Sequence, residues 1–171
     1  GASQISFSPD GRKLAVTTWG IPHFLTDDPK LKEIHPSRVY MYDFSNGTVN
    51  HRRYFEEAGI AGSVGFEWGP HAKRLYVTNF SIINAKGDNG LTVLQDNHDR
   101  LTKIANFPTG HTHPKDIDEA CWSALSPAKD MLYVVSYVTN VITPFRLDPE
   151  TGKVLERLPL ITRGTGYAPE G

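Results

Sequence analysis

The sequence predicts an all-β protein, a partial β-propeller of three four-stranded antiparallel blades. The first observation behind this prediction is an internal repeat. Three segments align without gaps: QISFSPDGRKLAVTT from Gln4, GFEWGPHAKRLYVTN from Gly65 and WSALSPAKDMLYVVS from Trp122. The second observation is the period, because Pro9, Pro70 and Pro127 are 61 and 57 residues apart. A period of this length with four short strands is typical of propeller blades. A sandwich does not need in-register copies of one hairpin, and solenoid repeats are mostly shorter.

Each repeat begins with a short apolar strand that ends at Ser-Pro or Gly-Pro. Proline has no N–H to donate, so it suits a strand end better than a central ladder position. In the first repeat, Asp10-Gly11 then supplies a hairpin turn, whereas His71-Ala72 and Ala128-Lys129 are weaker turn formers. The second strands, KLAVTT, RLYVTN and MLYVVS, are rich in β-branched and aromatic residues.

Two further strands complete each blade. Third strands are expected at residues 38–44, 90–96 and 141–148, and fourth strands begin near Val49, Leu101 and Val154. Pro144 inside the last third strand predicts a bulge there. The predicted blades cover about residues 1–61, 62–118 and 119–171 of a single propeller segment.

Composition narrows the function classes. The formal net charge of −1 gives no basic surplus for nucleic acid or an anionic membrane. Apolar runs are too short to span a bilayer.

The single cysteine, Cys121, excludes an internal disulfide and is expected to behave as a small buried hydrophobe. The start at Gly1, without methionine or signal peptide, indicates a processed or excised product. Two glycosylation sequons begin at Asn46 and Asn79 and favour a secreted or cell-surface protein, with a cytoplasmic one as the alternative.

The segments FSPDGRKLAV, RLYVTN and CWSALSP followed by LYVVS resemble the YVTN-type, lactonase-like seven-bladed β-propellers. This group includes the 6-phosphogluconolactonase and carboxymuconate-lactonising propellers. The repeat register places the signature at Leu132-Tyr133-Val134, so the literal Tyr137-Val138-Thr139-Asn140 is expected in the following turn. The resemblance implies a segment of a seven-bladed ring, which further blades or another copy of the chain would complete. It also implies a lactonase-like or cyclase-like protein that acts on or binds a small lactone or carboxylated ligand.

The same resemblance implies a His before one inner strand, an Arg before the next and a Glu after a second strand. The matching positions here hold Ser3-Gln4, Gly62-Ser63 and Thr78-Asn79-Phe80. No acid/base pair for lactone chemistry is therefore identified, and catalysis is left open. The alternative is a non-catalytic secreted or surface propeller that binds protein or carbohydrate.

Candidate ligand contacts lie in loops that the fold places at one face, around the channel mouth. The loop after the first second strand is much longer than a hairpin needs and carries Trp19, His23 and Asp27. The approach to the third blade is denser in polar groups and carries His111, His113, Asp116 and Glu119. His111 and His113 alternate, so in an extended segment they point the same way and suit a divalent metal. No other cofactor is predicted.

Three features away from these loops are expected to be structural. Trp68 and Trp122 lie on inner strands and are predicted to pack between blades. Arg52-Arg53 lies on an outer strand and is predicted to form a solvated face.

Overall fold

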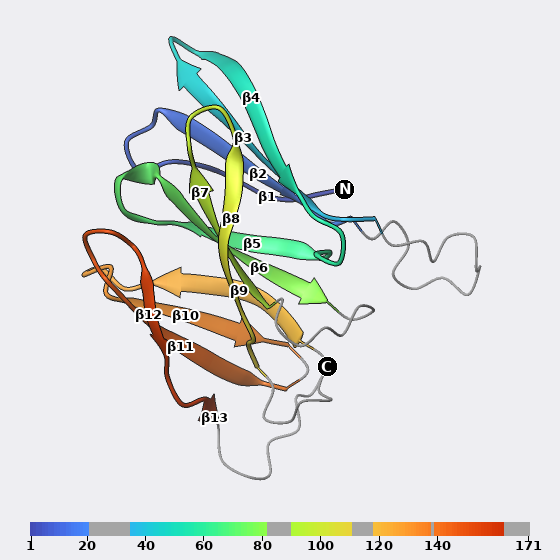
Figure 1. Cartoon of the computed structure of the whole chain (residues 1–171), viewed down its shortest axis with the longest axis vertical. Helices are drawn as coiled ribbons and strands as arrows, with labels where there is room; N and C mark the ends of the chain where they lie inside the picture. The colour runs from blue at the N-terminus through green and yellow to red at the C-terminus, as the bar shows by residue number, and fades with distance from the viewer. Residues whose placement is uncertain (21–34, 82–89, 111–117, 138, 163–171) are drawn as a thin grey trace, which may run out of the picture.

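The chain is an all-β partial propeller in which three antiparallel blades lie side by side (Figure 1). The structure, a computed structural model, describes residues 1–20, 35–81, 90–110, 118–137 and 139–162. The described residues form β-strands and one short 3-10 turn at Pro70–Ala72, and no α-helix. Within them, no helix is long and apolar enough to cross a membrane.

Each blade has four strands that follow one another in space as they do in sequence. Blade one consists of β1 (Ala2–Phe7), β2 (Lys13–Thr18), β3 (Arg38–Ser45) and β4 (Thr48–Glu56). Blade two consists of β5 (Ser63–Trp68), β6 (Arg74–Ser81), β7 (Leu91–Asp96) and β8 (Leu101–Phe107). Blade three consists of β9 (Asp118–Leu125), β10 (Met131–Ser136), β11 (Val141–Leu147) and β12 (Val154–Arg157), and β13 (Ile161–Thr162) pairs with β11.

Blades two and three share one continuous sheet. The end of β6 pairs with the start of β9 through Phe80 opposite Glu119 and Ser81 opposite Asp118. Blade one forms a separate four-stranded sheet. The inner strands follow one another from blade to blade, since β1 contacts β5 and β5 contacts β9, as they do in a propeller.

The strands lie where the repeat predicts them, with one correction at Pro144. The pairing of β11 with β10 is regular, with Pro144 opposite Tyr133, and the irregularity of β11 lies instead on its outer side, where its register with β12 shifts between Arg146 and Leu147. Pro144 falls between the residues of β11 that pair with β13 and those that pair with β12. Proline is therefore tolerated because no outer ladder partner needs its missing N–H.

The turns between the first and second strands share a positive φ at one repeat position, although the blade-two turn is a 3-10 turn in which His71 also has a positive φ of 56°. Gly11 has φ of 68°, and Ala72 and Lys129 reach φ of 51° and 60° at the matching repeat positions. In blades one and three a serine stabilises the turn: Ser8 Oγ accepts from Lys13 N at 2.9 Å, and Ser126 Oγ accepts from Met131 N at 3.0 Å. The weaker turn formers thus still form the predicted turn.

The core consists of two apolar clusters, one at each interface between blades. Trp68 lies in the cluster between blades one and two, as predicted. The second cluster joins blades two and three and includes Tyr76, Leu132 and Phe145. The prediction for Trp122 is wrong in this chain, since its side chain is 55% exposed on the far face of blade three.

The interface between blades one and two also contains a buried ion cluster. Arg53 donates to both carboxylate oxygens of Asp96, at 2.8 and 2.7 Å, and Lys13 Nζ lies 2.7 Å from Oδ2 of the same group. Arg53 also pairs with Asp43 at 3.0 Å. The prediction of a solvated Arg52-Arg53 face therefore holds for Arg52, which is exposed, and is wrong for Arg53.

Candidate functional site at the mouth end of the blades

The candidate site lies at the end of the blades where second strands finish and inner strands begin, which we call the mouth end. Trp19, Phe80 and Tyr137 all lie here, directly after or at the end of β2, β6 and β10. Each stands ten residues after the proline of its repeat. The segments that carry most of the predicted site residues connect to described residues at this same end.

The three aromatic rings form a row that crosses all three blades, which we call the aromatic row. The Trp19 and Phe80 rings stack with centroids 5.7 Å apart, and the Phe80 and Tyr137 rings are tilted with centroids 6.2 Å apart. Phe80 is buried, Trp19 is half-buried and Tyr137 is 65% exposed. A row of this kind offers an apolar surface with a phenol at one end. Sequence reasoning selected only Trp19, although the repeat register would have found the other two.

Backbone hydrogen bonds fix the spacing of the row. Gly62 N donates to the carbonyl oxygen of Trp19 at 2.8 Å, and Phe80 N donates to that of Gly62 at 2.7 Å. Gly62 has φ of +71°, and a Cβ there would lie 2.1 Å from the Phe80 carbonyl oxygen. Only glycine therefore allows the chain before β5 to approach the end of β6 this closely, while its N–H bonds to Trp19 of blade one.

A line of buried polar side chains supports the row from within blade two. Ser63 Oγ donates to Asn79 Oδ1 at 2.7 Å, and Asn79 Nδ2 donates to Thr92 Oγ1 at 2.9 Å. All three side chains are buried. This hydrogen-bond line joins β5, β6 and β7.

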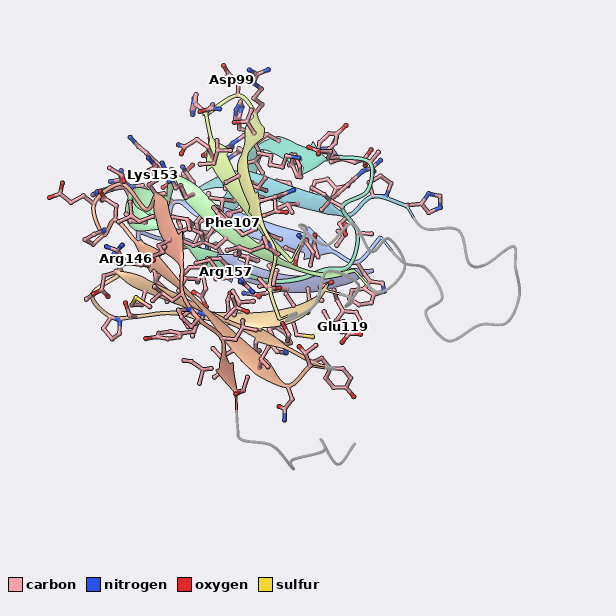
Figure 2. The ribbon with its side chains drawn as sticks, turned by 60° about the horizontal axis from the view of Figure 1, so that its bottom comes forward. Asp99, Phe107, Glu119, Arg146, Lys153 and Arg157 are labelled. Carbon is pink, nitrogen blue, oxygen red and sulfur yellow. The ribbon has the colours of Figure 1, made fainter. Side chains whose placement is uncertain are left out.

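Glu119, labelled in Figure 2, is the predicted site residue that the strand register places next to the aromatic row, opposite Phe80. It is buried at the start of β9, opposite Phe80, and its backbone oxygen accepts from Tyr137 N at 3.1 Å. Burial raises the pKa of the nearby Cys121 thiol to about 11, with a further contribution from the Glu119 charge. Cys121 is thus a protonated, half-buried thiol at neutral pH, in line with a structural role.

The other predicted contacts lie outside the described residues. These are His23 and Asp27 in the segment after Trp19, and His111, His113 and Asp116 in the segment before β9. The metal prediction for His111 and His113 stays a prediction for the same reason.

The positions where the resemblance expects catalytic groups hold side chains with structural hydrogen bonds. Gln4 makes two bonds to blade two, donating to the Phe66 carbonyl oxygen at 3.1 Å and accepting from its N–H at 2.9 Å. Ser63 and Asn79 belong to the buried polar line. Gln4 thus joins blade one to blade two, and Ser63 and Asn79 join strands within blade two.

The two sequons lie in contrasting surroundings. Asn46 is exposed in the β3–β4 turn, where a glycan has room. Asn79 is fully buried and its amide nitrogen already donates to Thr92, so the folded blade has no room for a glycan at that nitrogen. Asn46 is therefore the glycosylation candidate that the fold accommodates.

A group of described residues that could hold a metal lies elsewhere, at the outer edge of blades one and two. One ligand atom from each of His51, His98 and Asp99 lies within 4.8 Å of the other two, and all three residues are exposed. His51 Nε2 donates to the His98 carbonyl oxygen at 2.9 Å, and the two imidazole rings stack with centroids 5.2 Å apart. Figure 2 shows Asp99 at the β7–β8 turn, well away from Glu119. Sequence reasoning missed this group because no spacing rule connects β4 with that turn.

Comparison with solved structures confirms the fold. A candidate 6-phosphogluconolactonase from Bacteroides uniformis superimposes with a TM-score of 0.65 at 17% identity, over 95% of this chain and 41% of that one. The periplasmic gluconolactonase of Pseudomonas aeruginosa gives 0.64 at 19% identity, over 96% and 40%. The hydrazine synthase of Kuenenia stuttgartiensis gives 0.56 at 16% identity, over 88% and 46%.

The chain thus spans less than half the length of these similar structures. At these identities the likeness establishes a propeller fold, and one such fold serves different activities. No protein-family model matches the sequence. None of the curated proteins matches it either.

Proposed function

We propose that this chain forms part of a lactonase-like propeller, related to the YVTN type, that acts on or binds a small lactone or carboxylated ligand at the mouth end. The observation that carries the proposal is the aromatic row, in which Trp19 and Tyr137 leave ring surface accessible on either side of Phe80. A lactone or sugar ring has an apolar face that packs well on such a surface.

Two further observations support this proposal. Glu119 places a carboxyl group beside the row, and the segments that carry His23, Asp27, His111, His113 and Asp116 connect at the same end. Two similar structures are described as a candidate 6-phosphogluconolactonase and a gluconolactonase. In this proposal the other blades of the ring, or a second copy of the chain, would supply the rest of the mouth.

A second candidate function is non-catalytic binding of carbohydrate or protein by a secreted or surface propeller. The observation that favours it is the structural use of Gln4, Ser63 and Asn79 at the positions where the resemblance expects catalytic groups. An intact-mass measurement of the chain secreted from eukaryotic cells would test the part of this proposal that concerns secretion. A glycan at Asn46 supports that part, and an unmodified secreted chain counts against it.

The experiment that tests the main proposal is calorimetric titration of the chain with D-glucono-δ-lactone and gluconate, together with acid release in a pH-stat. Trp19→Ala and Tyr137→Ala are expected to weaken binding about tenfold each, because each removes a ring contact. Phe7→Ala is the matched control, since Phe7 is an exposed aromatic residue at the other end of blade one.

The outcomes separate the two functions. Acid release above the spontaneous rate, reduced in Glu119→Gln, supports catalysis. Binding that depends on the aromatic row without acid release supports the binding function. Absence of any binding, or equal losses in Phe7→Ala and Tyr137→Ala, overturns lactone and sugar-acid binding at this site.

A further inference from the structure

The two interfaces between blades are related by the repeat, so their residues can be compared position by position. The first interface holds the buried ion cluster of Lys13, Asp43 and Arg53 from blade one with Asp96 from blade two. Two cations here share one buried carboxylate, whose side chain is 2% exposed. The interface therefore has a position that accepts a carboxylate between blades.

The second interface keeps the cation of this position but not the acid. Arg74 replaces Lys13, since each stands four residues after the proline of its repeat. Leu147 replaces Asp96. The Asp96 N–H donates to the carbonyl oxygen of the residue just before β6, and the Leu147 N–H donates to that of the residue just before β10. The carboxylate that Lys13 contacts thus has no counterpart beside Arg74.

The other two members of the cluster are also replaced by neutral residues. Gln95 takes the place of Asp43, because the two lie opposite Arg74 and Lys13 in the strand registers. Ala105 takes the place of Arg53. Arg53 lies opposite the residue two before Asp43, and Ala105 lies opposite the residue two before Gln95. An alanine fills much less space than an arginine, so a hollow is expected between β8 and β12.

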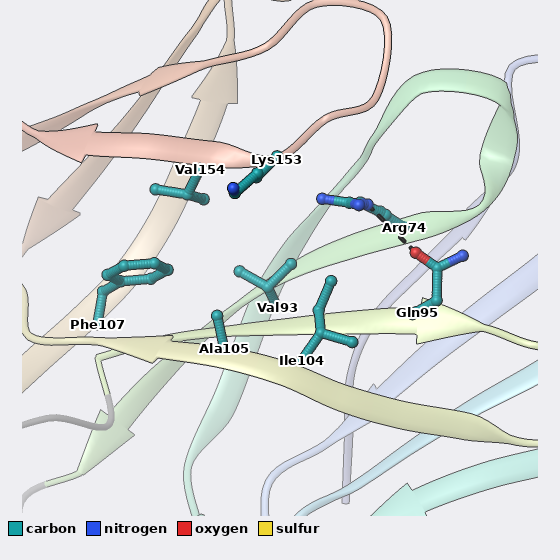
Figure 3. A pocket seen from close by; sticks show the side chains of 8 residues that line it. All are labelled: Arg74, Val93, Gln95, Ile104, Ala105, Phe107, Lys153 and Val154. Carbon is teal, nitrogen blue, oxygen red and sulfur yellow. Dashed lines mark hydrogen bonds between the residues drawn. The ribbon is translucent and has the colours of Figure 1, made fainter.

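A groove of about 480 Å³ lies at this place. Figure 3 shows that Arg74 and Lys153 both line this groove, and Gln95 Oε1 accepts a hydrogen bond from Arg74 Nε at 3.2 Å. The remaining lining is apolar: Val93, Ile104, Ala105, Phe107 and Val154. The volume is in the usual range for small-molecule sites.

The charges of the groove are unbalanced. Two of its eight lining residues are cations and none is an acid. Asp148 is close enough for its charge to interact with Arg74, but its Oδ1 accepts from the N–H groups of Glu150 and Thr151 at 3.0 and 2.8 Å. Backbone hydrogen bonds thus hold Asp148 in its own turn, and it is not one of the groove's lining residues.

We propose that this groove binds a small organic carboxylate with an apolar body. The carboxylate lies between Arg74 and Lys153, where it takes the role that Asp96 has in the first interface, and the body packs against Val93, Ala105 and Phe107. Arg74 and Lys153 supply charge-assisted hydrogen bonds, and the half-enclosed surroundings strengthen them relative to open water. This site is separate from the mouth end, and the proposal does not rest on the proposed function.

The test is titration of the chain with hexanoate and with its neutral analogue hexanamide, followed by calorimetry and by backbone amide NMR shifts. Hexanoate is expected to bind at least about tenfold more tightly than hexanamide, because the amide lacks the charge. Arg74→Gln and Lys153→Gln are each expected to weaken hexanoate binding about tenfold, whereas Arg74→Lys keeps most of it. Ala105→Leu fills the hollow and is expected to remove binding while the chain stays folded.

The matched control is Arg146→Gln, which removes an exposed cation of β11 that pairs with Glu156 outside the groove. Its hexanoate affinity is expected to stay within about twofold of the unmodified chain. Equal affinities for hexanoate and hexanamide, an equal loss in Arg146→Gln and Arg74→Gln, or unchanged binding in folded Ala105→Leu would each overturn the proposal. Tyr137→Ala distinguishes the two sites, since it should impair lactone binding at the mouth end and leave hexanoate binding unchanged.

Discussion

Among single residues, Asp96 has the largest electrostatic role that the structure shows. Burial alone raises the pKa of its carboxyl group, but hydrogen bonds from Arg53 and Lys13 and their charges outweigh burial and bring the pKa to about 2. One carboxylate of blade two therefore compensates two cations of blade one. Removing it leaves Lys13 without its carboxylate and leaves the buried Arg53 with Asp43 as its remaining acid partner among the described residues, which is the costly way to break a buried ion pair.

We predict that Asp96→Asn lowers the free energy of unfolding by about 3–5 kcal/mol at pH 7, measured by urea denaturation. Asp96 has a lowered pKa in the folded state, so its contribution is complete above its unfolded value of about 3.9 and is lost as pH falls towards about 2. The difference between the two proteins should thus shrink between pH 4 and 2. Glu150→Gln, at an exposed acid, is the control and should stay within about 0.5 kcal/mol. A constant difference over this pH range would contradict the assignment.

The pKa of Glu67 on β5 is shifted in the opposite direction to that of Asp96. Burial raises the pKa of Glu67, and the ionised form is the one that burial disfavours. The pKa of Glu67 is higher in the folded state than in the unfolded state, so the free energy of unfolding falls as pH rises between these two pKa values. Above both values the cost of burying the ionised carboxylate is present in full, including at neutral pH. We predict that Glu67→Gln raises the melting temperature at pH 7 and leaves it nearly unchanged well below the unfolded pKa. A lower melting temperature at pH 7 would show that the carboxylate has a stabilising partner instead.

Between elements, one hydrogen bond recurs from blade to blade. Thr17 Oγ1 donates to the Val64 carbonyl oxygen at 3.1 Å, and Thr78 Oγ1 donates to that of Cys121 at 2.6 Å. The donors stand eight residues after the proline of their repeats, and the acceptors lie on the next inner strand, six residues before its proline. In blade three the matching residue is Val135, which has no hydroxyl group and lies on the open face.

We predict that Thr78→Val lowers the free energy of unfolding by about 1–3 kcal/mol, since the shape is kept and a buried acceptor and the Gly65 N–H lose their partner. The reverse exchange, Val135→Thr, is the control and should change stability by less than about 0.5 kcal/mol because its side chain lies on the exposed face of blade three. Both values are accessible by chemical denaturation. Equal effects at the two positions would mean that the bond does not join blades.

A second element-scale prediction concerns Gly62, where blade one meets blade two. Gly62→Ala must accept both a positive φ and a contact of 2.1 Å with the backbone of Phe80, so the local strands have to separate. Gly47→Ala shares the positive φ, of +74°, but has open space around it. Gly47→Ala should therefore cost about 1–2 kcal/mol, and Gly62→Ala clearly more. Thermal unfolding measures both, and similar losses would rule out the close approach as the reason for glycine.

The sequence predicts the strands well because proline, turn and β-branched residues recur in one register. It predicts less where a residue depends on another blade. Arg53 looks solvated on an outer strand until Asp96 is placed opposite it. Pro144 looks like a bulge until the gap between the outer pairings is known. Of the aromatic row only Trp19 was selected, since Phe80 and Tyr137 gain meaning when three blades bring them together.

At the scale of the whole molecule, the three consecutive blades leave an exposed apolar face on blade one and another on blade three. On blade three, Trp122, Tyr133 and Val135 are exposed around a hollow of about 360 Å³. The matching side chain to Tyr133 in blade two, Tyr76, is fully buried under blade three. On blade one, Ile5 and Phe7 are exposed on the face that points away from blade two. Large uncovered apolar faces of this kind favour association with another surface.

We therefore predict that the 171-residue chain alone binds a hydrophobic dye and self-associates with rising concentration, as measured by light scattering. A head-to-tail contact between the blade-three face of one copy and the blade-one face of another would be heterologous, so the mass should grow beyond a dimer unless a ring closes. The double variant Tyr133→Glu with Val135→Lys puts charge on the blade-three face and should reduce both signals without loss of folded structure. Val49→Lys changes an equally exposed side chain on β4 and should leave both signals unchanged. A monomer at all concentrations without dye binding would show that these faces do not need a partner.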